Sequence, residues 1–399
     1  MEAFIEKYAL SPEQVDAPAC LERLLEEMAL GLEGKGNIPM VPSYLPMEIP
    51  NVAGKRCTVL DAGGTNLRVA QAEMDAKGNC RLGHVYMTRM PGSRETLGAS
   101  EFYALLASCV EHPEKAGKVG FCFSYDVELN RSLDGTLTRW SKEIRVPEAI
   151  GKPVGASLRE ALGAGCESVR VLNDSAAALL GAHHCHKEIT VGMILGTGVN
   201  ICYAEPCRNI PKLPGDLRRG RVIISTEIGE FDGFPKTRFD RAVIDASDTP
   251  SYYRGEKQCA GAYLGENIRL AWQQAILEGL LPPDFPLTAD LAVISAYLAG
   301  DSVLPQSSVA RGIARAIVHR GAKLAAVLAA GGIMRSCPQG ENCGMVMEGS
   351  TYYKLTDFAP CFRRELAALL EPRGISVTIH RVENSCLIGA ALAAFAEEM

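Results

Sequence analysis

The 399-residue sequence lacks the signals that mark several large classes of protein. Its 14 cysteines form no CxxC pair, and a chain of this length can bury a core without disulfides, so the cysteines indicate free thiols in a reducing compartment. Residues 1–6 are not a basic segment followed by an apolar one, and no apolar run of about 18 residues occurs. We therefore expect no signal peptide, no membrane span and a soluble cytoplasmic protein.

A basic surface field is also missing. The 41 Lys and Arg residues are outnumbered by 47 Asp and Glu, which leaves a net charge of −6. This balance excludes a general attraction to nucleic acid or to an anionic membrane, and the 47% hydrophobic content is that of an ordinary globular protein. An anionic substrate must therefore be held by local groups, and we expect small-molecule partners.

The commonest nucleotide-binding loops are absent as well. No GxxxxGK[ST] occurs, so the chain is not a P-loop protein. The G-x-G pairs at 163–165 and 196–198 are followed by Ser168 and Ile201, where a dinucleotide-binding fingerprint needs its third glycine. His319-Arg320-Gly321 lacks the aspartate of a protein-kinase catalytic loop.

The sequence does contain strand and helix patterns that are mixed along the chain, which predicts an α/β fold. A helix is expected over 13–33, followed by an extended connector with four prolines between 39 and 50. The other expected strands lie at 57–60, 67–72, 84–89, 118–123, 136–140, 168–172, 189–195, 200–204, 221–225 and 375–380. The other expected helices lie at 100–111, 175–185, 259–279, 287–299, 307–329, 358–371 and 386–397.

An internal repeat organises these elements. Residues 58–73 match residues 190–205 at a constant offset of 132, with six identical positions. Each copy is a strand, a Gly-Thr turn and a second strand. A duplicated fold would place the two turns across a cleft from each other; the alternative is a chance likeness between two β-hairpins.

The two glycine turns are candidate phosphate sites. In Asp61-Ala62-Gly63-Gly64-Thr65-Asn66, glycine lets backbone N–H groups approach an anion, and Asp61 offers an oxygen to Mg²⁺ through water. The alternative is a plain hairpin turn. The second copy, Gly196-Thr197-Gly198, favours the phosphate interpretation, because two such turns can clamp a polyphosphate from both sides.

Two other clusters allow both a chemical and a structural interpretation. Asn173-Asp174-Ser175 ends an apolar strand, where Asp174 or Ser175 can cap the next helix. Both roles are compatible if Ser175 caps the helix while Asp174 accepts a proton from a substrate hydroxyl. The histidines and cysteine of 183–186 could ligate a metal, but adjacent positions on a helix diverge and no second Cys/His cluster completes the set. We expect a surface helix end there.

Taken in order, the motifs resemble those of the hexokinase family. Asp61–Val69 is similar to the family's first phosphate motif, Asn173-Asp174 to its catalytic-aspartate motif and Gly196–Tyr203 to its second phosphate motif. The sugar-binding segment is matched by Gly120–Tyr125 with Trp140–Lys142, and the adenosine-side strand by Gly349–Leu355. Thr226–Phe231, Gly255–Lys257 and Tyr263–Glu266 continue the series, which runs from about residue 37 to the C-terminus.

This resemblance implies a duplicated ribonuclease-H-like fold of the actin and sugar-kinase type, with two lobes around a sugar and ATP cleft. The large lobe would comprise 1–54 plus 174–380, and the small lobe 55–173 plus 381–399. It also implies ATP- and Mg²⁺-dependent phosphorylation of a hexose, first of all D-glucose, at its 6-hydroxyl. The products would be hexose 6-phosphate and ADP, as in the entry step of glycolysis, and the enzyme would be a monomer or a homodimer.

The resemblance implies roles for individual residues. Asp174 would be the general base, and Lys142 would offset charge at the reacting phosphoryl group. The sugar would be held by Ser124, Ser141, Lys142, Asn173, Asp174, Asn200, Glu227 and Glu256. ATP would be held by Asp61, Gly63, Gly64, Thr65, Asn66, Arg68, Gly196, Thr197, Gly198, Gly332 and Ser350, with Asp61 also facing Mg²⁺ through water.

The sequence departs from the family's pattern at several points. Tyr125-Asp126 replaces the usual Phe-Pro, Ser141 replaces threonine, and Ile228 and Glu230 stand where Trp and Ala are usual. The glycine-rich strip before the last helix is reduced to Asn384–Ala391, which leaves the phosphoryl donor open. The alternatives are a kinase for glucosamine, mannose or fructose, a kinase with another donor, or a sugar sensor without turnover. A sugar-dependent repressor would need a basic DNA-binding module, which residues 1–54 do not provide.

Overall fold

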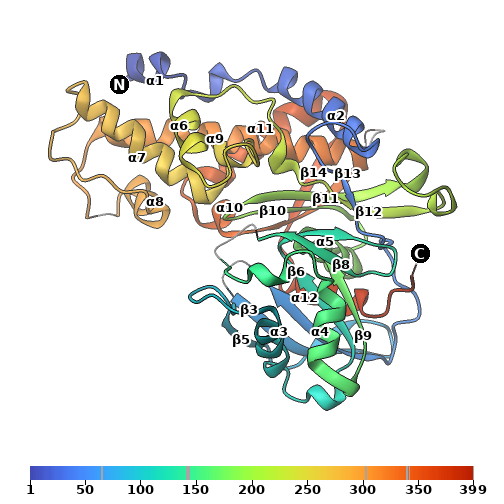
Figure 1. Cartoon of the computed structure of the whole chain (residues 1–399). Helices are drawn as coiled ribbons and strands as arrows, with labels where there is room; N and C mark the ends of the chain where they lie inside the picture. The colour runs from blue at the N-terminus through green and yellow to red at the C-terminus, as the bar shows by residue number, and fades with distance from the viewer. Residues whose placement is uncertain (64–65, 141–143, 302, 338–339, 341, 399) are drawn as a thin grey trace.

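The computed structural model describes residues 1–398 except 64–65, 141–143, 302, 338–339 and 341. The chain forms two lobes, each built on its own β-sheet (Figure 1). The N-terminal sheet has the order β4-β3-β2-β6-β9, with β5 paired to β3. Its strands are β2 (Arg56–Ala62), β3 (Asn66–Met74), β4 (Cys80–Leu82), β5 (Tyr86–Arg89), β6 (Gly117–Phe123) and β9 (Cys166–Leu172). A separate hairpin is formed by β7 (Asp126–Leu129) and β8 (Gly135–Arg139).

The C-terminal sheet has the order β1-β12-β11-β10-β13-β14. Its strands are β1 (Val41–Pro42), β10 (Ile189–Leu195), β11 (Val199–Pro206), β12 (Arg221–Ser225), β13 (Asn342–Glu348) and β14 (Ser376–His380). Strand β1 comes from the proline-containing connector, so this part of the chain is extended as expected and pairs with β12 at the edge of the C-terminal sheet.

The two sheets repeat one strand pattern. β2 pairs antiparallel with β3 and parallel with β6, which continues parallel to β9. β10 pairs in the same way with β11 and β13, and β13 continues parallel to β14. The hairpins β2–β3 and β10–β11 are the two copies of the sequence repeat. The predicted α/β class and the duplication are therefore confirmed, whereas the exact lobe boundaries stay a prediction.

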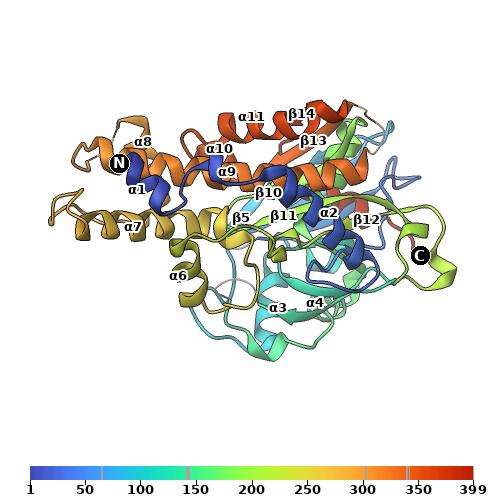
Figure 2. The same ribbon diagram turned by 90° about the horizontal axis from the view of Figure 1, so that it is seen from above.

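Helices cover the sheets. They are α1 (Glu2–Lys7), α2 (Ala17–Leu32), α3 (Ala99–Ser108), α4 (Val154–Leu162), α5 (Asp174–Cys185), α6 (Arg238–Ala246), α7 (Gly261–Leu277), α8 (Leu291–Ala299), α9 (Ser308–Ser336), α10 (Ser350–Lys354), α11 (Phe358–Leu370) and α12 (Ser385–Ala393). Figure 2 shows α2, α9 and α11 side by side on the C-terminal lobe. Among the described residues α9 alone is long and apolar enough to cross a membrane, but 83% of its apolar window is buried in the fold, as in a core helix.

Helices α5 and α12 lie between the two sheets (Figure 1) and touch backbone to backbone. A Cβ atom at Gly181 would overlap the carbonyl oxygen of Ser385, and a Cβ atom at Gly389 would overlap that of Ala177. Alanines on both helices complete the contact within one buried cluster. Because α5 follows β9 and α12 follows β14, this packing fixes where both helices begin relative to the two sheets.

One predicted element is wrong in type. The segment 349–355 was expected to be a strand, but the structure has helix α10 at Ser350–Lys354. The reason is Gly349, whose φ of 114° turns the chain out of β13, and whose missing Cβ avoids the carbonyl oxygen of Leu195.

Candidate active site

Asn173 and Asp174 stand where β9 ends and α5 begins. The cap of α5 is Asn173, whose Oδ1 accepts hydrogen bonds from the N–H of Ser175 at 2.8 Å and from its Oγ at 2.7 Å. Asp174 is the first helical residue, and its Oδ1 also accepts from the Ser175 N–H at 2.8 Å. The predicted cap by Asp174 or Ser175 is therefore wrong: Ser175 donates to the Asn173 side chain, which is the cap, and the half-buried Asp174 keeps a carboxylate at the strand tip.

A polar network joins this strand tip to the C-terminal sheet. Asn200 on β11 donates from Nδ2 to Glu227 Oε1 at 2.7 Å and to Ser225 Oγ at 2.9 Å. Ser225 Oγ also donates to Glu227 Oε1 at 2.9 Å and lies 3.3 Å from Asn173 Oδ1. The structure therefore brings Asn173, Asn200 and Glu227 together as predicted. Ser225 was missed, although a Ser-Thr-Glu sequence at the end of a strand is a signal that could have found it.

Glu227 and Glu256 are the two glutamates that the C-terminal lobe contributes near this network. Glu227 has a left-handed backbone with φ of 55°, a conformation that is uncommon outside glycine. Its half-buried position and the nearby charge of Asp126 raise its pKa to about 7. Glu256 Oε2 accepts a hydrogen bond from the Val199 N–H at 2.8 Å, and it packs against Gly198, where a side chain would collide with it.

The first glycine turn is tied to the predicted sugar segment. Ser124 is buried, with its N–H on the Ala62 carbonyl at 3.2 Å, and Tyr125 donates its hydroxyl to the Gly63 carbonyl at 2.8 Å. Asp61 is buried and accepts from Arg68 Nε at 2.8 Å. Asn66 is exposed at the start of β3, and Arg68 Nη1 reaches Asn384 Oδ1 at 3.5 Å, at the start of α12.

The second glycine turn is braced from the opposite side. The Gly196 carbonyl accepts from Thr351 Oγ1 at 2.7 Å and from the Gly261 N–H at 2.8 Å. Ser350 is exposed beside Gly196, and Thr197 is exposed at the tip of the turn. The turn therefore presents its surface next to the start of α10, as a phosphate and nucleoside site would require.

Comparison with known proteins connects this geometry to one family. Family models described as hexokinase match residues 1–184 and residues 190–297 with 294–396. The chain belongs to the hexokinase family. It is similar to Hexokinase-7 of Oryza sativa subsp. japonica, with 29% identity over 423 residues covering 93% of this chain and 91% of the relative. It is 30% identical to the chloroplastic Hexokinase-4 of the same plant, over 94% and 85% of the two chains.

A solved structure has the same fold. The fold matches that of a hexokinase from Schistosoma mansoni complexed with glucose, with a TM-score of 0.85, 24% identity and coverage of 99% and 98% of the two chains. The expected two-lobed sugar-kinase fold is therefore confirmed. As a member of the hexokinase family the protein is a phosphotransferase of the sugar-kinase class.

Several predicted residues of this hexokinase-family chain are not part of the observed cluster. Gly332 is buried on α9, where a Cβ atom would lie 2.6 Å from Ile201 Cγ2, so the glycine allows α9 to pack on β11. Its predicted role near the nucleoside stays a prediction. Gly64, Thr65, Ser141 and Lys142 lie outside the described residues, and so their predicted roles stay predictions too.

The histidines at the end of α5 form hydrogen bonds with backbone carbonyl groups. His183 Nδ1 lies 2.8 Å from the Ile189 carbonyl oxygen, and His184 Nε2 lies 2.8 Å from that of Gly78. Within the described part of the chain no group of three or more His, Cys, Asp or Glu is placed to hold a metal ion.

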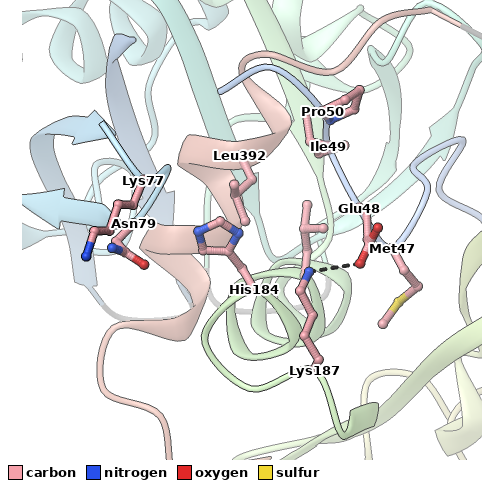
Figure 3. A pocket seen from close by; sticks show the side chains of 10 residues that line it. Met47, Glu48, Ile49, Pro50, Lys77, Asn79, His184, Lys187 and Leu392 are labelled. Carbon is pink, nitrogen blue, oxygen red and sulfur yellow. Dashed lines mark hydrogen bonds and ion pairs between the residues drawn. The ribbon is translucent and has the colours of Figure 1, made fainter. Parts of the chain in front are cut away.

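A pocket of about 580 Å³ is lined by His184 and lies where residues 47–50 meet the ends of α5 and α12 (Figure 3). Glu48 and Lys187 form an ion pair of 3.0 Å on its wall. None of the predicted sugar or nucleotide residues lines this pocket. The cluster around Asn173 is therefore a separate site.

The raised pKa of Glu227 predicts a pH-dependent stability. Between the ordinary value of 4.5 and about 7, the folded protein keeps a proton on Glu227 that the unfolded chain has lost. The contribution of this group to the free energy of unfolding therefore falls as the pH rises through that window. We expect Glu227→Gln to gain thermal stability relative to the wild type as the pH is raised from 5 to 8. Thermal unfolding without sugar at both pH values measures this, and a constant difference between the two proteins would contradict it.

Proposed function

We propose that this protein transfers the γ-phosphoryl group of ATP to the 6-hydroxyl of a hexose, D-glucose first of all. The observation that carries the proposal is the network of Asn173, Asn200 and Glu227 beside Asp174. A polyol needs amide and carboxylate partners for each hydroxyl, because an unpaired buried hydroxyl is unfavourable. Glucose in the Schistosoma mansoni structure of the same fold supports a hexose as the acceptor.

The chain's own groups divide the work of this reaction. Asp174 accepts the proton of the 6-hydroxyl, while Asn173, Asn200, Glu227 and Glu256 hold the other sugar hydroxyls. Phosphoryl transfer needs positioning and charge stabilisation more than covalent help. The glycine turns at 63–66 and 196–198 therefore hold the phosphates from the two lobes.

The residues around the first turn fit a magnesium-bound nucleotide. Asp61 and Asp174 offer carboxylate oxygens, the ligands that Mg²⁺ prefers. Burial of the Tyr125 hydroxyl, and after it the charges of Asp61 and Asp174, raise the pKa of Tyr125. Bound there, Mg²⁺ would neutralise charge on the phosphate oxygens, with Asp61 holding it through water. The 14 free cysteines suit the proposed cytoplasmic location.

The test is the release of ADP from Mg-ATP with glucose, mannose, fructose and glucosamine, together with calorimetry of each sugar. Turnover with glucose supports the proposal. Faster turnover with another hexose would reassign the substrate. If sugar binds but no hexose phosphate forms with ATP, pyrophosphate or polyphosphate as the donor, the protein is instead a sensor.

A further inference from the structure

A compact polar cluster joins the two lobes beside the sugar residues. Asp126 Oδ2 accepts hydrogen bonds from Arg139 Nε at 2.8 Å, from Arg139 Nη2 at 2.6 Å and from the Tyr253 hydroxyl at 2.8 Å. Asp126 and Arg139 are cross-strand partners at the base of the β7–β8 hairpin, whose Leu129 and Leu137 belong to the core of the N-terminal lobe. Tyr253 belongs to the loop between α6 and α7 of the C-terminal lobe. The Asp126 carboxylate therefore binds groups from both lobes.

Tyr253 is held in place before it meets Asp126. Its N–H donates to Glu230 Oε2 at 2.7 Å, and its φ of 51° is left-handed. The buried Lys257 donates from Nζ to the Thr249 carbonyl at 2.5 Å and to the Tyr252 carbonyl at 2.7 Å, which closes the loop on itself. The Tyr253 hydroxyl is thus presented from a braced loop.

Each member of the cluster is close in sequence to a predicted sugar residue. Asp126 comes two residues after Ser124, and Arg139 comes two residues before Ser141. Tyr253 comes three residues before Glu256, and Glu230, which holds it, comes three residues after Glu227. Asp126 and Glu230 are also positions where the sequence departs from the family's usual Pro and Ala. Asp126 and Glu230 both accept a hydrogen bond from Tyr253, one from its hydroxyl and the other from its N–H, so the two substitutions belong to one cluster.

We propose that Asp126, Arg139 and Tyr253 form a clasp that holds the two sides of the sugar cleft together before the sugar binds. This role rests on the proposed function. A sugar that needs both lobes binds only the molecules whose lobes are already arranged for it. Its apparent Kd is the intrinsic Kd divided by the fraction of such molecules, so a larger fraction gives tighter binding. The clasp raises that fraction. It is a positioning device that lowers the hexose KM and leaves kcat unchanged, because saturating sugar fills the closed state with or without it.

The test compares Tyr253→Phe, Asp126→Asn and the double variant with the wild type. Tyr253→Phe removes the hydroxyl but keeps the ring, whose centroid lies 5.1 Å from the Arg139 guanidinium. Tyr253→Phe loses the hydrogen bond to the Asp126 carboxylate, and Asp126→Asn replaces the charged acceptor by a neutral amide. We therefore expect the hexose KM and the calorimetric Kd to rise about tenfold, with kcat within about twofold. The double variant should lose less than the sum of the two single losses, because both changes weaken the contact between Asp126 and Tyr253.

Hydrogen exchange gives a readout that does not depend on turnover. Without sugar, residues 126–139 and 249–257 should exchange faster in the variants than in the wild type. With saturating glucose the difference should disappear, because sugar binding restores the closed arrangement.

The matched control is Asp216→Asn. Arg131 and Asp216 pair at 3.1 Å across the same two lobes, at the far end of the same hairpin, but their side chains are 54% and 60% exposed. An exposed pair contributes little, so KM should stay within about twofold. An unchanged KM in Tyr253→Phe and Asp126→Asn, or a fall in kcat alone, would overturn the clasp while the wild-type activity stands. A wild type that binds no hexose would overturn the proposed function and this role together.

Discussion

Replacing Asp174 by alanine is expected to lower the kcat of hexose phosphorylation by about 10²- to 10⁴-fold, the range for loss of a positioned base. The hexose Kd should change far less, because the hydrogen bond of Asn200 to Glu227 and the link of Asn173 to Glu227 through Ser225 do not involve Asp174. Rates of ADP release and calorimetry on the same samples measure the two quantities.

The structural role of Asp174 can be separated from this loss. Asn173 caps α5, so Asp174→Ala should leave the thermal unfolding temperature nearly unchanged. Asp174→Asn keeps the shape but cannot take the proton, and it should lose as much activity as the alanine variant. A variant that retains more than about a tenth of the wild-type kcat would contradict Asp174 as the base.

The largest expected loss of stability is at Arg320. Its Nη1 pairs with Asp240 Oδ2 at 3.0 Å, and the two side chains are only 5% and 4% exposed. Arg320 Nη2 also donates to the Pro235 carbonyl and to Gln258 Oε1. These bonds connect α9 to the chain on both sides of Glu256. Arg320→Ala leaves the Asp240 carboxylate buried without its cation, which should lower the free energy of unfolding by about 3–5 kcal/mol.

Urea unfolding of a small set of variants checks this prediction. The double variant Arg320→Met with Asp240→Leu should lose less than Arg320→Ala alone, because no lone charge remains. Arg56→Ala is the matched surface control: Arg56 and Glu73 pair at 3.0 Å with side chains 77% and 54% exposed, so the loss should stay below about 1 kcal/mol. Equal losses at Arg320 and Arg56 would contradict the buried role.

The elements that the sequence could predict are those whose signal is local. The hairpins β2–β3 and β10–β11 follow from a repeated strand–glycine–strand pattern. The start of α5 follows from Asn173-Asp174-Ser175 at the end of an apolar strand, although the cap is Asn173 and not Asp174 or Ser175 as predicted. Strand β13 was missed because Gly344 and two methionines have weak strand preference. Its parallel neighbours β10 and β14 make it a strand.

The site was predictable only in part for a similar reason. The positions of Asn173, Asn200 and Glu227 came from motifs, each of which is contiguous in sequence. The contacts of Asp126 with Tyr253 join segments more than a hundred residues apart, so no local pattern shows them. Ser225 was missed because its position depends on how β12 lies against β11.

The contact between α5 and α12 also has a symmetry. Gly181 of α5 rests on the carbonyl of Ser385, four residues before Gly389, and Gly389 rests on the carbonyl of Ala177, four residues before Gly181. Such a reciprocal pairing is what a two-fold axis between identical subunits produces. The chain thus carries the interface of a symmetric pair inside one polypeptide. Because the two halves are encoded separately within one chain, a residue in one half can differ from its counterpart in the other. Helix α5 begins with Asp174, whereas α12 begins with Ser385.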